Sequence, residues 1–137
     1  MALTHLVDTS VLTRLAEPAV RAALEPLAAV GRVGRSGISD LEIGYSARNA
    51  REWDALQTAL STFGLVETEA HHVNRARQVQ RLLASRSQPG RKVPDLLVAA
   101  AAEDAGLIVL HYDSDFDRIA AVTGQKCEWV APPGSID

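Results

Sequence analysis

The chain has 137 residues, of which 47% are hydrophobic and 23% charged, a balance that is typical of one folded domain and excludes a disordered chain. The formal net charge is −3, which taken alone disfavours a nucleic-acid-binding protein. The single cysteine, Cys127, excludes an internal disulfide, and the lack of any apolar stretch of about 18 residues excludes a membrane span, so we expect a cytoplasmic protein.

The first quarter of the sequence predicts a strand, two helices and a second strand. Residues 4–7 (THLV) are typical of a short buried strand. Residues 10–30 carry apolar side chains at helical spacing, and we expect two short helices that break near Pro18, with a further kink possible at Pro26. The glycine-rich residues 31–37 bracket a strand of two or three residues.

Two further helices and another strand are expected in residues 39–85. Ser39 is a good N-cap for the next helix, and Glu42 completes the capping-box spacing. Residues 50–63 form a helix whose core-facing side chains are Trp53, Leu56, Leu60 and Phe63, and residues 64–68 form a strand. Residues 70–85 form a helix with an apolar stripe of Val73, Ala76, Val79 and Leu83.

The last third contains the clearest strand. After a loop, residues 93–106 form a helix with Pro94 in its first turn and Gly106 at its end. The continuous apolar run 107–112 (LIVLHY) is typical of a parallel strand that is covered on both faces. A helix at 113–124 and a short strand at 127–130 follow, so the fold class is α/β with a mostly parallel sheet.

Carboxylates follow the two best-defined strands. Asp8 follows the first strand, and Asp113 and Asp115 follow the strand at 107–112. If these strands are neighbours, the acids meet at the carboxyl edge of the sheet, where ligands bind in such folds. Helix starts would bring Glu42 and Asp95 to the same edge, although either acid could also serve only as a helix cap.

Two choices stay open within this acidic group. Asp40 competes with Glu42 for the position near the site. Among the three acids after the late strand, we expect Asp113 and Asp115 to face inward and Asp117 to lie on the surface. So many carboxylates need a counter-charge, and oxygen ligands without sulfur favour Mg²⁺ or Mn²⁺, which implies metal-assisted attack on a phosphodiester.

Four segments make this pattern specific: LVDTSVLTRL, SDLEIGYSAR, the basic helix, and VPDLLVAAAAEDAGLIVLHYDSDFDRIA. Over nearly the whole chain they resemble the PIN-domain ribonucleases, and most closely the VapC toxins of bacterial type II toxin–antitoxin modules. The resemblance implies one PIN domain over residues 1–137, with a three-layer sandwich around four or five short strands.

The resemblance also implies roles for individual residues. Asp8, Asp95, Asp113 and Asp115 match metal-binding acids, Glu42 matches a further catalytic acid, and Thr9 and Ser10 match small polar residues that hydrogen-bond the first acid. The implied activity is Mg²⁺- or Mn²⁺-dependent cleavage of RNA to 5′-phosphate and 3′-hydroxyl ends. We expect the RNA substrate to be a structured one, a tRNA or an rRNA. The implied partners are a VapB-type antitoxin and a second copy of the chain.

Basic residues gather in one acid-free window, from Ala70 to Pro94, which carries a local charge of +6. Within it Arg86, Arg91 and Lys92 are candidate contacts to the RNA backbone, although a solvated helix face would show the same pattern. His71 and His72 are adjacent on a helix and are expected at the surface as a poor metal pair, and His111 is expected to be structural.

Other readings of the sequence fit less well. A response-regulator receiver and a haloacid-dehalogenase phosphatase both need residues that this chain lacks at the corresponding positions. The rival from another class is a non-catalytic PIN-like RNA-binding or scaffold module, but such modules usually lose acids that are kept here.

Overall fold

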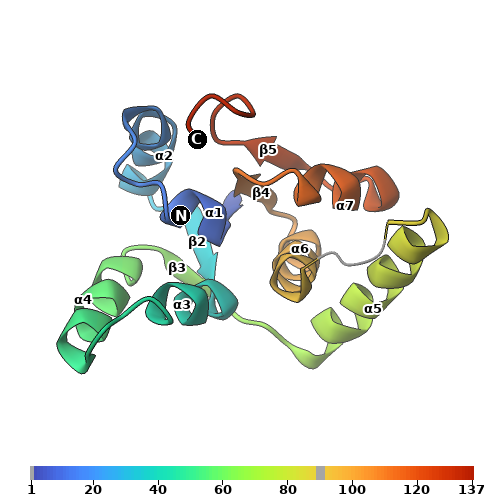
Figure 1. The fold of residues 1–137 in the computed structure, drawn as a ribbon, viewed down its shortest axis with the longest axis horizontal. Coiled ribbons are helices and arrows are strands. Elements are labelled where there is room, and N and C mark those ends of the chain that lie inside the picture. Colours follow the sequence, from blue (N-terminus) through green and yellow to red (C-terminus); the bar gives the residue numbers. More distant parts are fainter. Residues whose placement is uncertain (1, 89–91) are drawn as a thin grey trace.

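The computed structural model describes residues 2–88 and 92–137, and it shows a central five-stranded sheet with helices on both faces (Figure 1). The strands are short: β1 (His5–Val7), β2 (Val33–Ser36), β3 (Gly64–Val66), β4 (Ile108–His111) and β5 (Cys127–Trp129). They run in the order β3-β2-β1-β4-β5, and each neighbouring pair is parallel. The α/β class with a parallel sheet is therefore confirmed.

Seven helices connect these strands in the described residues: α1 (Thr9–Leu12), α2 (Pro18–Ala29), α3 (Gly37–Gly44), α4 (Ala50–Leu60), α5 (Ala70–Ser85), α6 (Val93–Ala105) and α7 (Asp115–Thr123). Proline sets the start of α2 and α6, as expected, because its missing N–H has no partner in a first helical turn. Gly106 ends α6 with φ of 70°, a conformation that glycine adopts without strain.

The core lies in two layers, one on each face of the sheet. Leu6 and Val109 pack on one face with side chains of α5, α6 and α7. Val7 and Leu110, the next residues along the same strands, pack on the other face with α1, α2 and the end of α4. Successive side chains of a strand point to opposite faces, so the apolar runs of β1 and β4 supply both layers.

The start of the third helix differs from the prediction. Ser36, and not Ser39, is the N-cap of α3, and its hydroxyl accepts a hydrogen bond from the Ile38 amide at 3.1 Å. Ser39 lies inside the helix and is fully buried. Because β2 continues directly into α3, Glu42 lies beyond the first helical turn instead of within it.

Two apolar residues assigned to the core are exposed. Trp53 is 46% exposed and Val73 is 47% exposed, whereas Leu60, Phe63, Val79 and Leu83 are buried as predicted. Trp53 lies against α3, where a Cβ built at Gly44 would come within 2.7 Å of the Trp53 Nε1 atom. It therefore packs between two helices near the edge of the fold and not under the sheet.

Candidate active site

The two strands that carry acids at their ends are neighbours. Val7 of β1 pairs with Leu110 of β4, and the Asp8 amide donates to the Leu110 carbonyl at 2.9 Å. After these two strands the chain continues toward opposite edges of the sheet: β2 and β3 lie on the outer side of β1, and β5 lies on the outer side of β4. Such a switch point opens a crevice outside the carboxyl ends of the strands.

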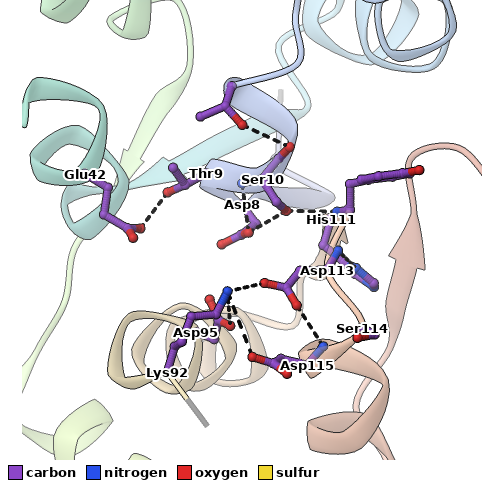
Figure 2. A network of polar contacts seen from close by, with 12 residues as sticks. Asp8, Thr9, Ser10, Glu42, Lys92, Asp95, His111, Asp113, Ser114 and Asp115 are labelled. Atoms are coloured by element: carbon purple, nitrogen blue, oxygen red, sulfur yellow. Dashed lines mark hydrogen bonds and ion pairs between the residues drawn. The ribbon is translucent and has the colours of Figure 1, made fainter. Parts of the chain in front are cut away.

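A cavity of about 250 Å³ lies at this switch point. Polar side chains dominate its wall, which consists of Asp8, Thr9, Ser10, Thr13, Arg14, Glu42, Lys92, Asp95, Tyr112 and Asp113. Figure 2 shows the carboxylates of Asp8, Asp95 and Asp113 facing a common space, although they come from the end of β1, the start of α6 and the end of β4. Residues that are far apart in the sequence thus meet in one acidic cavity.

Three of the acids form a tight group. Asp95, Asp113 and Asp115 each offer an oxygen within 4.8 Å of the others, close enough to share a cation. The Asp115 amide donates to Asp113 Oδ1 at 2.9 Å, which fixes the turn between β4 and α7. Asp8 faces the same cavity but lies outside this group, so it lines the site from the opposite side.

Asp8 is buried and well hydrogen-bonded. Its Oδ2 accepts from the Ser10 hydroxyl at 2.6 Å and from the Ser10 amide at 3.0 Å, while the Ser10 Oγ accepts from the Tyr112 amide at 2.9 Å. Burial raises the pKa of Asp8, and the hydrogen bonds from Ser10 oppose that rise. Ser10 therefore joins the acid after β1 to the end of β4.

Among the four aspartates of the site, Asp95 has the environment that is least favourable to a charged carboxylate. It is 5% exposed, and its buried Oδ2 has no hydrogen-bond partner among the described residues. Burial, together with the charge of Asp8, raises the pKa of Asp95 to about 7. A buried carboxylate oxygen without a donor, directed at two further carboxylates, fits a divalent cation with oxygen ligands such as Mg²⁺ or Mn²⁺.

Lys92 supplies the positive charge nearest to this group. Its Nζ lies 2.5 Å from Asp113 Oδ2, 3.6 Å from Asp95 Oδ2 and 4.0 Å from Asp115 Oδ2 (Figure 2). Burial opposes the charged form, but the hydrogen bond to Asp113 and the neighbouring acids raise the pKa of Lys92 overall. The same lysine lowers the pKa of Asp113, against the effect of burial.

The choice between Asp40 and Glu42 is clear from their contacts. Asp40 accepts from the Arg35 guanidinium at 2.8 Å and is not part of the cavity wall. Glu42 lines the cavity, and its Oε1 accepts from the Thr9 hydroxyl at 2.7 Å. Thr9 Oγ1 also lies 2.8 Å from the Ser39 hydroxyl, so the buried Ser39 helps to hold Thr9 in place.

Two other residues near the site have structural contacts. Asp117 is exposed and accepts from the Trp129 indole at 3.0 Å, away from the three grouped acids. His111 is fully buried between Phe116 and Trp129, and its Nδ1 accepts from the Asp113 amide at 3.2 Å. Burial lowers the pKa of His111, which keeps it neutral beneath the acids.

The two adjacent histidines are not both surface residues. His72 is 3% exposed, and both His71 and His72 place Nε2 at 2.9 Å from Asp104 Oδ2. The Glu69 amide donates to His72 Nδ1 at 3.0 Å, so Nδ1 is the accepting nitrogen and Nε2 donates to Asp104. With no free lone pair on His72, this group joins α5 to α6 as a hydrogen-bond network and not as a metal site.

The candidate RNA contacts separate in space. Arg86 is exposed at the end of α5, whereas Lys92 belongs to the acidic cavity, and Arg91 lies outside the described residues. The position of Lys92 among the acids was missed, although its spacing of three residues before Asp95 on a helix start was a usable signal. Arg14 was missed as well; it lines the cavity and donates to the Ser10 carbonyl at 2.7 Å.

Comparisons with known proteins agree with this arrangement. The PIN domain family model matches residues 5–122. The chain is 64% identical to ribonuclease VapC51 of Mycobacterium tuberculosis (strain ATCC 25618 / H37Rv) over 137 residues, which is all of both chains. It is 42% identical to ribonuclease VapC21 of M. tuberculosis (strain CDC 1551 / Oshkosh), with 98% of this chain and 99% of that protein covered.

A solved structure shows the same fold at low sequence identity. The DNA-bound VapBC structure from Salmonella typhimurium matches with a TM-score of 0.79 and 19% identity, over 94% of this chain and 99% of that chain. Among residues 2–88 and 92–137, no helix has the length and apolar character needed to cross a lipid bilayer. Sequence and fold together show that this chain belongs to the PIN-domain family, within its VapC group.

Proposed function

We propose that the chain is a metal-dependent endoribonuclease that acts as the toxin of a toxin–antitoxin pair. The observation that carries this proposal is the group of Asp95, Asp113 and Asp115 around a buried oxygen of Asp95, to which no residue in the described ranges 2–88 and 92–137 donates a hydrogen bond. The names of the VapC ribonucleases support RNA as the substrate. Cleavage of cellular RNA would place its action in the cytoplasm.

The ion would be held by Asp95, Asp113 and Asp115, with Asp8 on the opposite wall of the cavity. Carboxylate oxygens alone favour Mg²⁺ or Mn²⁺ over softer metals. When bound, such an ion lowers the pKa of a water molecule and offsets the charge that develops on a phosphodiester.

The chain's own residues orient this chemistry. Ser10 holds the Asp8 carboxylate through its hydroxyl and its amide, so that this acid faces the cavity in one orientation. Thr9 holds Glu42 at the rim, where the carboxylate could orient a water molecule in an outer position. Attack by water in line with the leaving 3′ oxygen would give a 5′-phosphate and a 3′-hydroxyl.

The partners follow from the same family membership. We propose that Arg86, Arg91 and Lys92 contact the RNA backbone, and that the RNA is a structured one such as tRNA or rRNA. The VapBC structure from Salmonella typhimurium supports a VapB-type antitoxin as the inhibitory partner. We further propose a homodimer and a single domain over residues 1–137.

A cleavage assay with a structured RNA tests the enzyme activity. We expect cleavage with Mn²⁺ or Mg²⁺, none in EDTA, and a loss of more than about 100-fold in Asp113→Asn, because even outer-shell partners of a metal site cost 10–100-fold. Asp117→Asn is the matched control, since it removes an exposed acid that bonds only Trp129 among the contacts described. Cleavage in EDTA, or cyclic phosphate ends, would contradict the metal-dependent mechanism.

The toxin role needs a separate test in cells. Expression should arrest bacterial growth, and Asp8→Asn should relieve the arrest without loss of folded protein, because it removes only the acid's charge. RNA binding without cleavage and without growth arrest would indicate a non-catalytic scaffold instead.

A further inference from the structure

Lys92 stands where a metal ion would bind. The three oxygens around its Nζ, at 2.5, 3.6 and 4.0 Å, are the Oδ2 atoms of Asp113, Asp95 and Asp115. These are the same three residues whose oxygens could share an ion. The ammonium therefore supplies counter-charge to all three crowded carboxylates, while Arg118 adds an ion pair to Asp115 alone, with its Nη1 3.4 Å from Asp115 Oδ1.

The lysine and a divalent ion cannot occupy this place together. Magnesium ligands lie about 2.0–2.1 Å from the ion, so an ion bound to these oxygens would come within a few ångströms of the ammonium. Two positive charges at that separation in a half-buried site repel strongly. One of them has to leave when the other binds.

The position of Lys92 allows its ammonium group to move away from the three carboxylates. Lys92 is the N-cap residue of α6: its backbone carbonyl accepts from the Leu96 amide at 3.3 Å, but its side chain makes no cap hydrogen bond within the described part of the chain. Its side chain is 57% exposed, whereas the side chain of Asp95 is 7% exposed, so the charge sits on a flexible stem at the solvent side of buried acids. Asp95, by contrast, is fixed in the first helical turn.

We propose that Lys92 is a resident counter-ion of the metal-free site and that metal binding displaces its ammonium from Asp95, Asp113 and Asp115. The inference rests on the proposed function, because it takes these three acids as the metal site. The lysine keeps the empty site from destabilising the fold, and it weakens metal binding by competing for the same oxygens. The metal concentration at which the enzyme becomes active is therefore set in part by Lys92.

Titration of Mn²⁺ alone, followed by calorimetry, tests the competition in Lys92→Met. We expect this variant to bind Mn²⁺ at least about tenfold more tightly than the native chain, because the ion no longer displaces a bound ammonium. In EDTA the same variant should unfold at a lower temperature than the native chain, and added Mn²⁺ should restore its stability. Lys126→Met is the matched control: it removes the same charge from an exposed lysine after α7 and should change neither measurement.

Each of the other outcomes of these measurements contradicts a different part of the proposal. If the native chain binds Mn²⁺ and Lys92→Met binds it no more tightly, the competition is wrong while the metal-dependent function stands. An equal gain in Lys126→Met would assign the effect to overall charge, and an unchanged stability of Lys92→Met in EDTA would remove the counter-ion role. If neither the native chain nor Lys92→Met binds Mn²⁺, the metal site itself fails, and the displacement fails with it.

Discussion

At the scale of single residues, two buried acids in one cavity have different environments. Asp8 receives two hydrogen bonds from Ser10, whereas the buried Oδ2 of Asp95 receives none from the part of the chain that the structure describes. Burial raises the pKa of both carboxyl groups, and that of Asp95 reaches about 7. The metal-free protein thus holds Asp95 partly protonated at neutral pH, while a bound ion requires it ionised.

The raised pKa of Asp95 predicts how the stability of the metal-free protein depends on pH. The folded state keeps a proton that the unfolded chain loses near pH 4, so the free energy of unfolding should fall as pH rises from about 4 to about 7. A difference of about three pKa units corresponds to about 4 kcal/mol. Denaturant titrations in EDTA at several pH values measure this fall.

Asp95→Asn is the variant that isolates the effect. It cannot ionise, so its free energy of unfolding in EDTA should lose most of the decline between pH 4 and 7. Asp117→Asn changes an exposed carboxyl group and should keep the decline of the native chain. A decline of equal size in Asp95→Asn would assign the pH dependence to other groups.

The sequence was sufficient to predict those acids of the candidate site whose position depends only on the end of a strand. Asp8 and Asp113 follow apolar runs that had to be parallel strands, and parallel strands bring their carboxyl ends to one edge. The sequence could not separate Glu42 from Asp40, because the choice depends on Arg35, which draws Asp40 into an ion pair away from the cavity. The place of Lys92 was missed for a related reason, since it depends on Asp113, 21 residues further along.

At the scale of helices and strands, periodicity predicted the order of elements but not every boundary. The predicted order of strands and helices is correct throughout the described residues, because the spacing of apolar residues in each segment matches either a helix or a strand. The predicted start of α3 was wrong, because serine is an equally good N-cap at position 36 and at position 39 when the sequence is considered alone. Pairing of β2 with β1 ends the strand at Ser36 and makes the earlier serine the cap.

The packing of α3 against α4 depends on the absence of a side chain at Gly44. A Cβ there would lie 2.7 Å from Trp53 Nε1 and 3.2 Å from Gln57 Nε2. Gly44→Ala should therefore lower the free energy of unfolding by about 1–3 kcal/mol, as overpacking usually does, and should change the fluorescence of Trp53. Denaturant titration followed by fluorescence measures both effects.

Gly37→Ala is the control within the same helix. A Cβ at Gly37 meets no described residue within 4 Å, and alanine favours the helical conformation there, so this variant should be as stable as the native chain or more stable by up to about 1 kcal/mol. If Gly44→Ala proved equally stable, α4 would have to shift without cost, and Trp53 would not fix its position.

At the scale of the whole molecule, the acid-free window from Ala70 to Pro94 offers less free positive charge to RNA than its sequence suggests. Arg75 forms an ion pair with Glu103 of α6 at 2.6 Å, and Lys92 lies among the acids of the cavity. Both charges are thus partly neutralised by acids that are distant in the sequence. The exposed arginines that stay along α5 are Arg77, Arg81 and Arg86, on a chain whose net charge is −3.

The dependence of RNA binding on salt reports how many of these arginines contact phosphate. Each contact to single-stranded RNA contributes about −0.7 to the slope of log K against log salt, because binding releases a counter-ion. Replacing Arg77, Arg81 and Arg86 with glutamine should therefore make the slope shallower by up to about 2 and weaken binding most at low salt. The measurement uses the Asp113→Asn background, so that RNA is bound and not cleaved.

Position on the surface, and not total charge, should decide this result. A control triple with Arg21, Arg48 and Arg51 replaced by glutamine removes the same charge from α2, from the segment before α4 and from the first turn of α4, on the side of the fold away from α5 (Figure 1). If the phosphates lie along α5, the control keeps the native slope, because counter-ions are released only where charges come within contact distance. Native slopes in both triples would mean that the RNA is held by the cavity itself and that the arginines of α5 are a solvated face. Equally shallow slopes in both triples would assign the effect to total charge.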